Sequence, residues 1–268
     1  MLGPWAFVHV TLLLVKSTLF GLAAAITLLV PSLAAADNYV VYVHGRSQTT
    51  WDGAIYPESG WKTAIVQYNS TTQTLAQSNV DVRRQLAQYC SGNNACVIVA
   101  YSNGGLQVGY TQAFYPDAVE NALYIEAGAS AAGGSDLLNS FTGPVGQVFG
   151  ATYPNGVDAT LSVSGARNAY NHNLTAGLTT YHLGGNTDWR NGLWYVTAGL
   201  LPGNDDGVVS YHSAFGCSSS GSQTTSCTKY AGHRLDSGAT SGSMKCSGAV
   251  CSSVDHFGMD DRAAYWAF

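Results

Sequence analysis

The chain has 268 residues, 46% of them apolar, so it is long enough to bury one substantial core and we expect a single domain. Its formal charge is −5, and only 10% of its residues are charged. The composition contains no basic stripe or polybasic patch, which argues against a nucleic-acid partner.

Residues 1–36 have the pattern of an export signal that is removed from the mature protein. The segment contains no acidic residue and ends in three alanines, which is typical of an apolar export segment followed by a small-residue cleavage site. An N-terminal membrane anchor is the alternative, since two apolar runs flank Lys16. Translation from Val15 would shorten the segment to a basic start, an apolar run and the cleavage site. We therefore expect a secreted or periplasmic protein whose folded domain spans residues 37–268.

Apolar runs of strand length alternate with stretches of helical periodicity along the mature chain. This alternation predicts an α/β fold with a mostly parallel sheet covered by helices on both faces. Helices are expected over residues 74–89 and 104–115. The expected strands, all rich in β-branched and aromatic side chains, are residues 39–43, 64–68, 96–101, 122–127 and 180–183.

Two regions depart from this alternation. Residues 130–178 are too long for a plain connection and contain helical patterns around 136–149 and 161–173, so we interpret this span as a cap insertion over a site. The tail from Cys217 to Cys251 is rich in Ser and Gly, and we interpret it as irregular surface loops.

The six cysteines are an even number, and export would place them in an oxidising compartment. Sequential pairing closes three short loops at low entropic cost, although six cysteines allow fifteen connectivities. No C-x-x-C or H-E-x-x-H spacing is present, so we predict disulfides and no metal site. The predicted pairs are Cys90 with Cys96, Cys217 with Cys227, and Cys246 with Cys251.

The strongest motif lies where the strand pattern CVIVAY stops at Ser102 and a helical pattern begins at once. A sharp strand-to-helix turn presents a serine hydroxyl as a nucleophile, and it needs small residues two positions before and after. Ala100 and Gly104 meet that need, in an A-x-S-x-G variant of the usual G-x-S-x-G. A serine that only caps an ordinary helix is the alternative.

A second motif, His44-Gly45-Arg46, directly follows the first predicted strand. The backbone N–H groups of Arg46 and Asn103 are predicted to form an oxyanion hole. We expect His44 to be a buried structural histidine that holds this loop, and the Arg46 side chain to face an acidic or polar group of the substrate.

A nucleophilic serine needs a base within hydrogen-bond reach and a carboxylate that fixes the tautomer of that base. In hydrolases that carry their serine on such a strand-to-helix turn, the triad residues follow in the chain order serine, acid, histidine. This order restricts the base to His212, His233 or His256. We predict His256, because it directly precedes a short helical stretch at the C-terminus.

The acid is indicated by a resemblance. The stretch Asn204-Asp205-Asp206-Gly207-Val208-Val209 resembles the Asp-Gly-Val-Val segment of bacterial secreted triacylglycerol lipases of the α/β-hydrolase superfamily. The chain is similar to that family also in its HG loop, its serine elbow and its C-terminal histidine, in the same order.

This resemblance implies an α/β-hydrolase fold and a Ser-His-Asp triad with Asp206 as the acid, with Asp188 and Asp205 as alternatives. It implies hydrolysis of carboxylic esters through an acyl-enzyme, with water as second substrate and no cofactor. The family often binds a structural calcium through an Asp two residues after the histidine. That position is Gly258 here, so the sequence does not support calcium.

Aromatic residues lie near each motif and are predicted to line the substrate site, with core filling as the alternative for each. The expected substrate is a lipid or polyester ester, and the expected state is a monomer without a stable membrane anchor. A polyester depolymerase acting on polyhydroxyalkanoate or aromatic polyester, or an amidase or peptidase with the same triad, is the alternative function. The aromatic residues are Trp51, Tyr101, Trp189 and Phe257.

Overall fold

A computed structural model describes most of the chain beyond the predicted export segment. The described residues are 36–139, 156–185, 201, 205–215, 233–235, 246–247, 250–251 and 254–267. The export segment lies outside them, except for Ala36. Its removal therefore stays a prediction.

Five parallel strands form the centre of the sheet in the order β2, β1, β3, β4, β5. Each begins and ends within two residues of its predicted bounds, because continuous runs of β-branched and aromatic residues are typical of strands buried on both faces. The predicted parallel α/β sheet is confirmed. The bounds are β1 Asn38–Val43, β2 Lys62–Val66, β3 Ala95–Tyr101, β4 Ala122–Gly128 and β5 Thr180–Gly185.

Three very short strands extend the sheet beyond β5. Strand β6 (His233–Leu235) pairs with the first half of β5, and β8 (Val250–Cys251) pairs with its last two residues, both in parallel. Strand β7 (Cys246–Ser247) is antiparallel to β8. The prediction of irregular loops for the tail was wrong at these places, because two or three residues are too few to show strand alternation.

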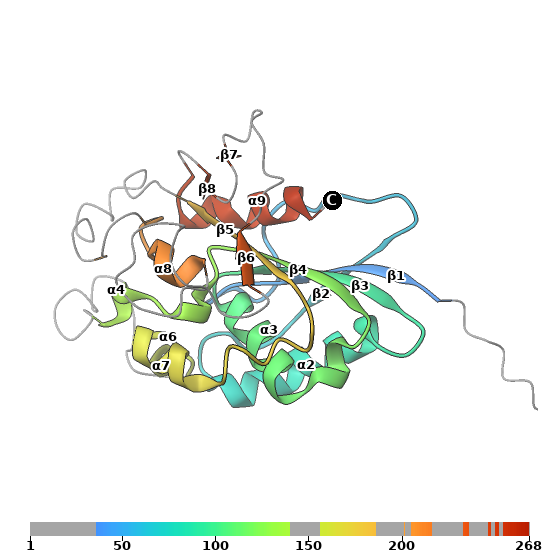
Figure 1. Cartoon of the computed structure of the whole chain (residues 1–268), viewed down its shortest axis with the longest axis horizontal. Helices are drawn as coiled ribbons and strands as arrows, with labels where there is room; N and C mark the ends of the chain where they lie inside the picture. The colour runs from blue at the N-terminus through green and yellow to red at the C-terminus, as the bar shows by residue number, and fades with distance from the viewer. Residues whose placement is uncertain are drawn as a thin grey trace, which may run out of the picture. The chain divides into compact units, whose positions relative to one another are not determined.

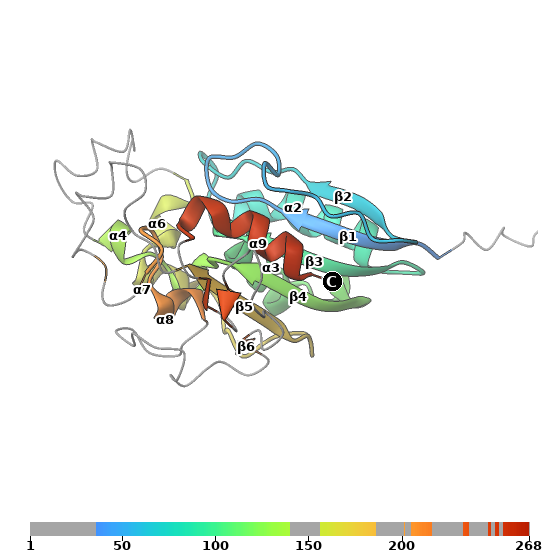
Figure 2. The same ribbon diagram turned by 90° about the horizontal axis from the view of Figure 1, so that it is seen from above.

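The helices cover both faces of the sheet, with α2 and α3 on one face and α9 on the other (Figures 1 and 2). Alternate residues of β1 serve the two faces. Val41 and Val43 pack in one buried cluster with the α2 side chain Leu86, whereas Val40 and Tyr42 belong to a second cluster that includes α9. The helices are α2 Leu75–Cys90, α3 Asn103–Phe114, α4 Asp136–Asn139, α6 Asp158–Leu161, α7 Val163–Ala169, α8 Tyr211–Ala214 and α9 Met259–Trp266.

The predicted cap insertion, residues 130–178, is described in two pieces. The helix expected from residue 136 begins there as α4, and residues 140–155 lie outside the described part. The helix expected over 161–173 is instead two shorter helices, α6 and α7, separated at Ser162, which has extended backbone angles and caps α7 with its hydroxyl. None of the helices in the described ranges is long and apolar enough to cross a bilayer.

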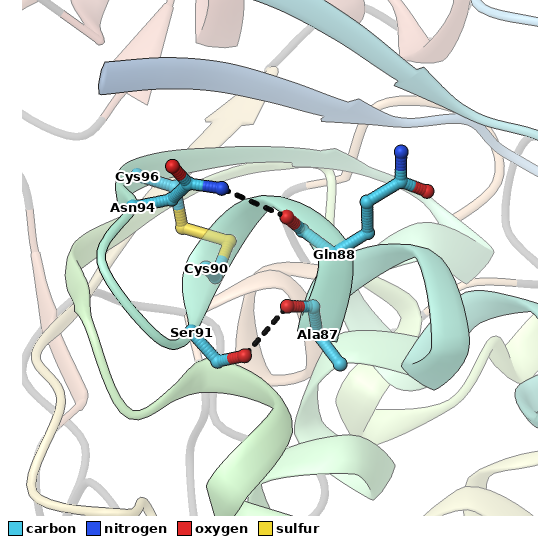
Figure 3. Close-up of a disulfide and its surroundings, with 6 residues drawn as sticks. All are labelled: Ala87, Gln88, Cys90, Ser91, Asn94 and Cys96. Atoms are coloured by element: carbon cyan, nitrogen blue, oxygen red, sulfur yellow. Dashed lines mark hydrogen bonds between the residues drawn. A yellow bond between two sulfur atoms is a disulfide. The ribbon is translucent and has the colours of Figure 1, made fainter. Parts of the chain in front are cut away.

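A disulfide ties the end of α2 to the strand that leads to Ser102. Cys90 and Cys96 are bonded, which confirms the first predicted pair (Figure 3). Hydrogen bonds support the same turn: Ser91 Oγ donates to the Ala87 carbonyl at 2.6 Å, and Asn94 Nδ2 donates to the Gln88 carbonyl at 3.1 Å.

The other two predicted disulfides stay predictions. Cys217 and Cys227 lie outside the described residues. Cys246 and Cys251 are described as strand backbone only, and they face each other in the register of β7 and β8. Directly opposed antiparallel residues lie at Cα separations that a disulfide can span.

Candidate active site

Ser102 occupies a sharp turn between β3 and α3. Its backbone has φ 52° and ψ −121°, a conformation that a non-glycine residue rarely adopts. The turn is held by main-chain bonds, since Ser102 N donates to the Gly128 carbonyl at 3.1 Å and the Ser102 carbonyl accepts from Ala131 N at 2.9 Å. This strained backbone geometry is typical of a nucleophile elbow. A serine that only caps a helix does not require it.

The elbow allows no side chain at Gly104. A Cβ there would collide with the Val43 carbonyl oxygen and lie 2.8 Å from that of His44. Ala100, two residues before the serine, is fully buried. The small residues singled out in the sequence therefore bring the start of α3 against the end of β1.

His256 lies between the serine and an aspartate. Its Nε2 is 3.0 Å from Ser102 Oγ, and its Nδ1 is 2.9 Å from Asp206 Oδ2. The main chain fixes the same neighbourhood, because His256 N donates to the Asp206 carbonyl at 2.9 Å. All three side chains are buried, with Ser102 still 8% exposed.

Asp206 is held by its own turn. Its Oδ1 accepts hydrogen bonds from Val208 N at 3.0 Å and Val209 N at 2.8 Å, while Oδ2 faces His256. The turn requires Gly207, which has φ 92°. An acceptor-only carboxylate beside Nδ1 places the imidazole proton on Nδ1 and leaves Nε2 as an acceptor for the serine hydroxyl.

The rival acids and bases lie elsewhere or outside the described residues. Asp205 accepts from Gly207 N at 2.8 Å, and His212 is paired with Asp136 at 3.3 Å. Asp188 and the side chain of His233 are not among the described groups.

The loop after β1 is connected to the elbow by a buried chain of hydrogen bonds. The Tyr68 hydroxyl donates to the His44 carbonyl at 2.6 Å and accepts from Asn103 Nδ2 at 3.3 Å. His44 stacks on the Tyr68 ring, with centroids 4.2 Å apart, and its Nδ1 lies 2.9 Å from the Gly45 carbonyl. Burial lowers the pKa of His44, so its ring is neutral near pH 7, in keeping with the structural role expected for this residue.

Arg46 follows His44 by two residues in this loop, and Asn103 takes part in the hydrogen-bonded chain through its side-chain amide. Asn103 is the first residue of α3, so its N–H has no partner within the helix. The Arg46 guanidinium forms a two-point ion pair with Asp158, and Arg46 also lines the cavity beside Ser102, so the expectation that its side chain faces a polar group of the substrate stays a prediction. Sequence reasoning had no access to a partner 112 residues away.

A cavity of about 420 Å³ opens beside Ser102 and His256. One part of the cavity wall is polar and is formed by residues between Arg46 and Asp52 in the loop after β1. The rest is mainly apolar and comes from the described part of the predicted cap insertion, from the turn after Asp206 and from the turn at His256. The lining residues are Arg46, Ser47, Gln48, Asp52, Tyr101, Ser102, Ala131, Ser135, Leu137, Leu138, Leu161, Val208, Val209, His256 and Phe257.

Two of the four predicted aromatic residues line this cavity, the buried Tyr101 and Phe257, which is 58% exposed. Burial raises the pKa of Tyr101 well above its ordinary value, so its hydroxyl stays protonated. Trp51 was wrongly assigned to the substrate site. It is a core residue, 5% exposed and packed on Tyr42, and its Nε1 donates to the Ala54 carbonyl at 3.2 Å. Trp189 lies outside the described residues.

Sequence reasoning missed the aliphatic lining. Leu137, Leu138 and Leu161 come from the predicted cap insertion, and Val208 and Val209 follow Asp206. The Val-Val pair was part of a quoted motif, so that motif was the available signal. Nothing in the sequence distinguishes the leucines from core residues. Among the described residues, no group of three or more His, Cys, Asp or Glu side chains is arranged to hold a metal ion.

Comparison with solved structures identifies the fold. The mature form of Bacillus licheniformis lipase BlEst2 aligns over 89% of this chain and 91% of its own, with a TM-score of 0.59 and 15% sequence identity. The propeptide form of the same lipase aligns over 89% of this chain but only 49% of its own, with a TM-score of 0.57 and 15% identity. No protein-family model and no curated protein sequence matches the chain. The chain has the α/β-hydrolase fold, which confirms the predicted fold class.

Proposed function

We propose that this protein is a serine hydrolase that cleaves carboxylic ester bonds. The observation that carries the proposal is the continuous hydrogen-bonded path from Ser102 Oγ through His256 to Asp206, with separations of 3.0 and 2.9 Å, beside an open cavity. The fold shared with a protein described as a lipase supports ester hydrolysis as the reaction class.

In the proposed reaction, His256 Nε2 takes the hydroxyl proton as Ser102 Oγ attacks the ester carbonyl carbon. The Asp206 carboxylate stabilises the resulting imidazolium and keeps its Nδ1–H in place. The same imidazolium then protonates the leaving alcohol oxygen as the C–O bond breaks. Water, activated by His256, hydrolyses the acyl-serine and regenerates the enzyme. The chemistry uses no cofactor.

The main-chain N–H groups of Arg46 and Asn103 are the proposed oxyanion hole. The close approach of α3 to the His44 carbonyl places the β1 loop beside the elbow, which supports this pair. Donors held there in advance stabilise the negative oxygen of the tetrahedral intermediate, and loss of one typically lowers kcat by about 10²–10³-fold.

The cavity supports an acyl or alcohol group of apolar character as the bound part of the substrate. Leu137, Leu161 and Val209 supply aliphatic surface within reach of the reacting serine. Export from the cytoplasm is part of the proposal, and the Cys90–Cys96 disulfide supports it because such bonds persist in oxidising compartments.

The test compares Ser102→Ala with wild type on p-nitrophenyl butyrate. The variant is expected to lose at least about 10⁴-fold in kcat, and Ser91→Ala, at the end of α2 and outside the cavity, is expected to retain wild-type kcat. Rates of the wild type on a long-chain ester, a polyester film and an anilide then define the substrate class. Retention of activity by Ser102→Ala would disprove the assignment.

A further inference from the structure

The loop after β1 is held by the side chain of its own arginine. Arg46 Nη2 donates to Asp158 Oδ2 at 2.8 Å, its Nε donates to Asp158 Oδ1, and its Nη1 donates to Ser47 Oγ at 2.9 Å. Ser47 has a left-handed φ of 62°, which disfavours this turn in the absence of supporting contacts. The planar guanidinium therefore joins a strained turn to a fixed carboxylate.

Asp158 is itself fixed by the residues around it. It is 2% exposed and is the first residue of α6. Gly156, two residues before it, has φ 61° and packs so closely on the backbone of the β2–α2 loop that a Cβ would lie 2.5 Å from Thr72 C. At the other end of α6, Ser135 N donates to the Leu161 carbonyl at 2.7 Å. Asp158 is therefore held in place by packing and hydrogen bonds at both ends of α6, and the loop after β1 is attached to it through Arg46.

The geometry makes the anchor relevant to catalysis. Under the proposed function, the main-chain N–H of Arg46 must lie about 2.7–3.1 Å from the oxyanion. Displacements of about 1 Å cost as much as 10²-fold in rate at such sites. The side chain of the same residue ends on Asp158, so the position of that N–H depends on the ion pair.

We propose that Asp158 is a positioning residue for the oxyanion hole, acting through the Arg46 guanidinium to hold the Arg46 main-chain N–H in place. The inference rests on the proposed ester-hydrolase function and adds to it a residue of the α6 segment that no sequence motif indicates. It assigns Asp158 no contact with the substrate or the reacting atoms.

The experiment measures kcat and KM on p-nitrophenyl butyrate for wild type, Asp158→Asn, Asp158→Ala, Arg46→Ala and the double variant Arg46→Ala/Asp158→Ala. Each rate is divided by the concentration of reactive serine, titrated with a fluorophosphonate to its endpoint, so that misfolded protein is not counted. Arg84→Ala is the matched control, since Arg84 pairs with Asp81 at 3.2 Å in an exposed ion pair on α2. This control is expected to keep wild-type kcat.

The proposal expects Asp158→Asn to lower kcat by about 10–100-fold with KM within about threefold, since the oxyanion hole acts on the transition state. Arg46→Ala is expected to show the same loss, and the double variant no further loss than the single variants, because the two residues act as one unit. Non-additive losses in kcat of this kind support the proposal.

Two results overturn it. Wild-type kcat per reactive serine in Asp158→Asn, with only a lower melting temperature, means that the ion pair merely stabilises the fold. A loss in Arg46→Ala but not in Asp158→Asn means that the guanidinium acts on the substrate directly, because removing the carboxylate leaves its charge in place. The Ser102→Ala protein distinguishes failure of this proposal from failure of the proposed function. If Ser102→Ala is inactive, either result defeats only the role of Asp158. If Ser102→Ala is fully active, the proposed function itself is defeated.

Discussion

Every side-chain oxygen of Asp206 faces a hydrogen-bond donor. Oδ1 accepts from two main-chain N–H groups and Oδ2 faces His256 Nδ1. A carboxylate can meet all three donors, whereas an amide brings an NH₂ group that must point at one of these donor sites. The residue type at 206 is therefore fixed by its donors, independently of any sequence motif.

Asp206→Asn is expected to lower kcat on p-nitrophenyl butyrate by about 10⁴-fold, with little change in KM. An amide nitrogen beside Nδ1 favours the tautomer with its proton on Nε2, which cannot accept the proton of Ser102. Asp205→Asn is the matched control, because its side-chain oxygen can still accept from Gly207 N, and it should stay within a few-fold of wild type. Equal losses in both variants would contradict the assignment of the acid.

The position of α3 is set by its contact with the end of β1. The start of the helix lies so close to the strand that a methyl group at Gly104 would meet two carbonyl oxygens, those of Val43 and His44. Backbone atoms cannot rotate away as a side chain can. Relief therefore requires movement of the helix, and with it Ser102 and Asn103.

Gly104→Ala is expected to destabilise the fold by about 2–3 kcal/mol and to lower activity in the folded fraction. The comparison is Gly177→Ala, which adds the same methyl group in open space and costs only the strain of its φ of 75°, about 1 kcal/mol. Urea unfolding curves measure both. An equal cost for the two variants would mean that α3 adjusts without resistance.

The Cys90–Cys96 disulfide also fixes the end of α2 to β3. The cysteines are six residues apart, so reduction frees only a short loop, and the chain-entropy relation predicts a stabilisation of about 2 kcal/mol. Cys90→Ala/Cys96→Ala is expected to lose about that much in free energy of unfolding. Its kcat should stay near wild type, because the bridge lies at the opposite end of β3 from Ser102.

Dithiothreitol provides the control for this bridge. The reagent should lower the midpoint of unfolding more in wild type than in the double variant, and the difference isolates the Cys90–Cys96 bond from any other disulfide. A shift of the same size in both proteins would show that this bond contributes nothing to stability.

Across the molecule, the features that could be predicted from the sequence are those encoded within one segment of the chain. The five central strands follow from runs such as Cys96–Tyr101, and the elbow follows from a serine between Ala100 and Gly104. Asp206 is indicated by the Asp-Gly-Val-Val stretch through a family resemblance, and His256 by the chain order and by its place before the C-terminal helical stretch.

The features missed are those created by assembly. The Arg46–Asp158 pair, the leucines of the cavity wall and the buried position of Trp51 each depend on segments that meet only in the folded chain. A single sequence specifies the pattern of each segment but not which segments become neighbours. The short strands β6 to β8 also depend on their partners, because a pair of residues becomes a strand only beside an existing edge.

The carboxyl of Asp260 couples the stability of the whole fold to pH. It lies on α9 against the β1 loop: a Cβ at Gly53 would be 2.8 Å from its Cγ, and its Oδ1 accepts from Asp261 N at 2.7 Å. Burial raises the pKa of Asp260 to about 7, and the neighbouring carboxylates of Asp261 and Asp52 add to the increase. At a pH between these two values, the folded protein therefore keeps a proton on Asp260 that the unfolded chain, with a carboxyl pKa near 3.8, has lost.

The sign follows from proton linkage. Between about pH 4 and 7 the folded state binds more protons than the unfolded state at this site, so the free energy of unfolding falls as pH rises. His172 acts in the opposite direction. Burial lowers its pKa to about 4, so between about pH 6.5 and 4 the unfolded chain binds a proton that the folded state does not, and the free energy of unfolding falls as pH falls. The pH dependence of the wild type combines these contributions with those of other groups, such as His44 and His212, whose pKa values are lowered by burial. The difference between wild type and an Asp260 variant isolates the contribution of Asp260.

Asp260→Asn removes the titrating group while keeping its shape. The variant is expected to be more stable than wild type by about 1–3 kcal/mol at pH 8, where wild type must hold a buried carboxylate, and to lose this advantage at pH 4. Urea unfolding at pH 4, 6 and 8 measures the difference, with Asp81→Asn on the exposed face of α2 as the control that should show no such trend. If the free energies of unfolding of wild type and Asp260→Asn changed in parallel with pH, this carboxyl would have the same pKa in the folded and unfolded chains. Its packing between α9 and the loop after β1 would then not raise the pKa.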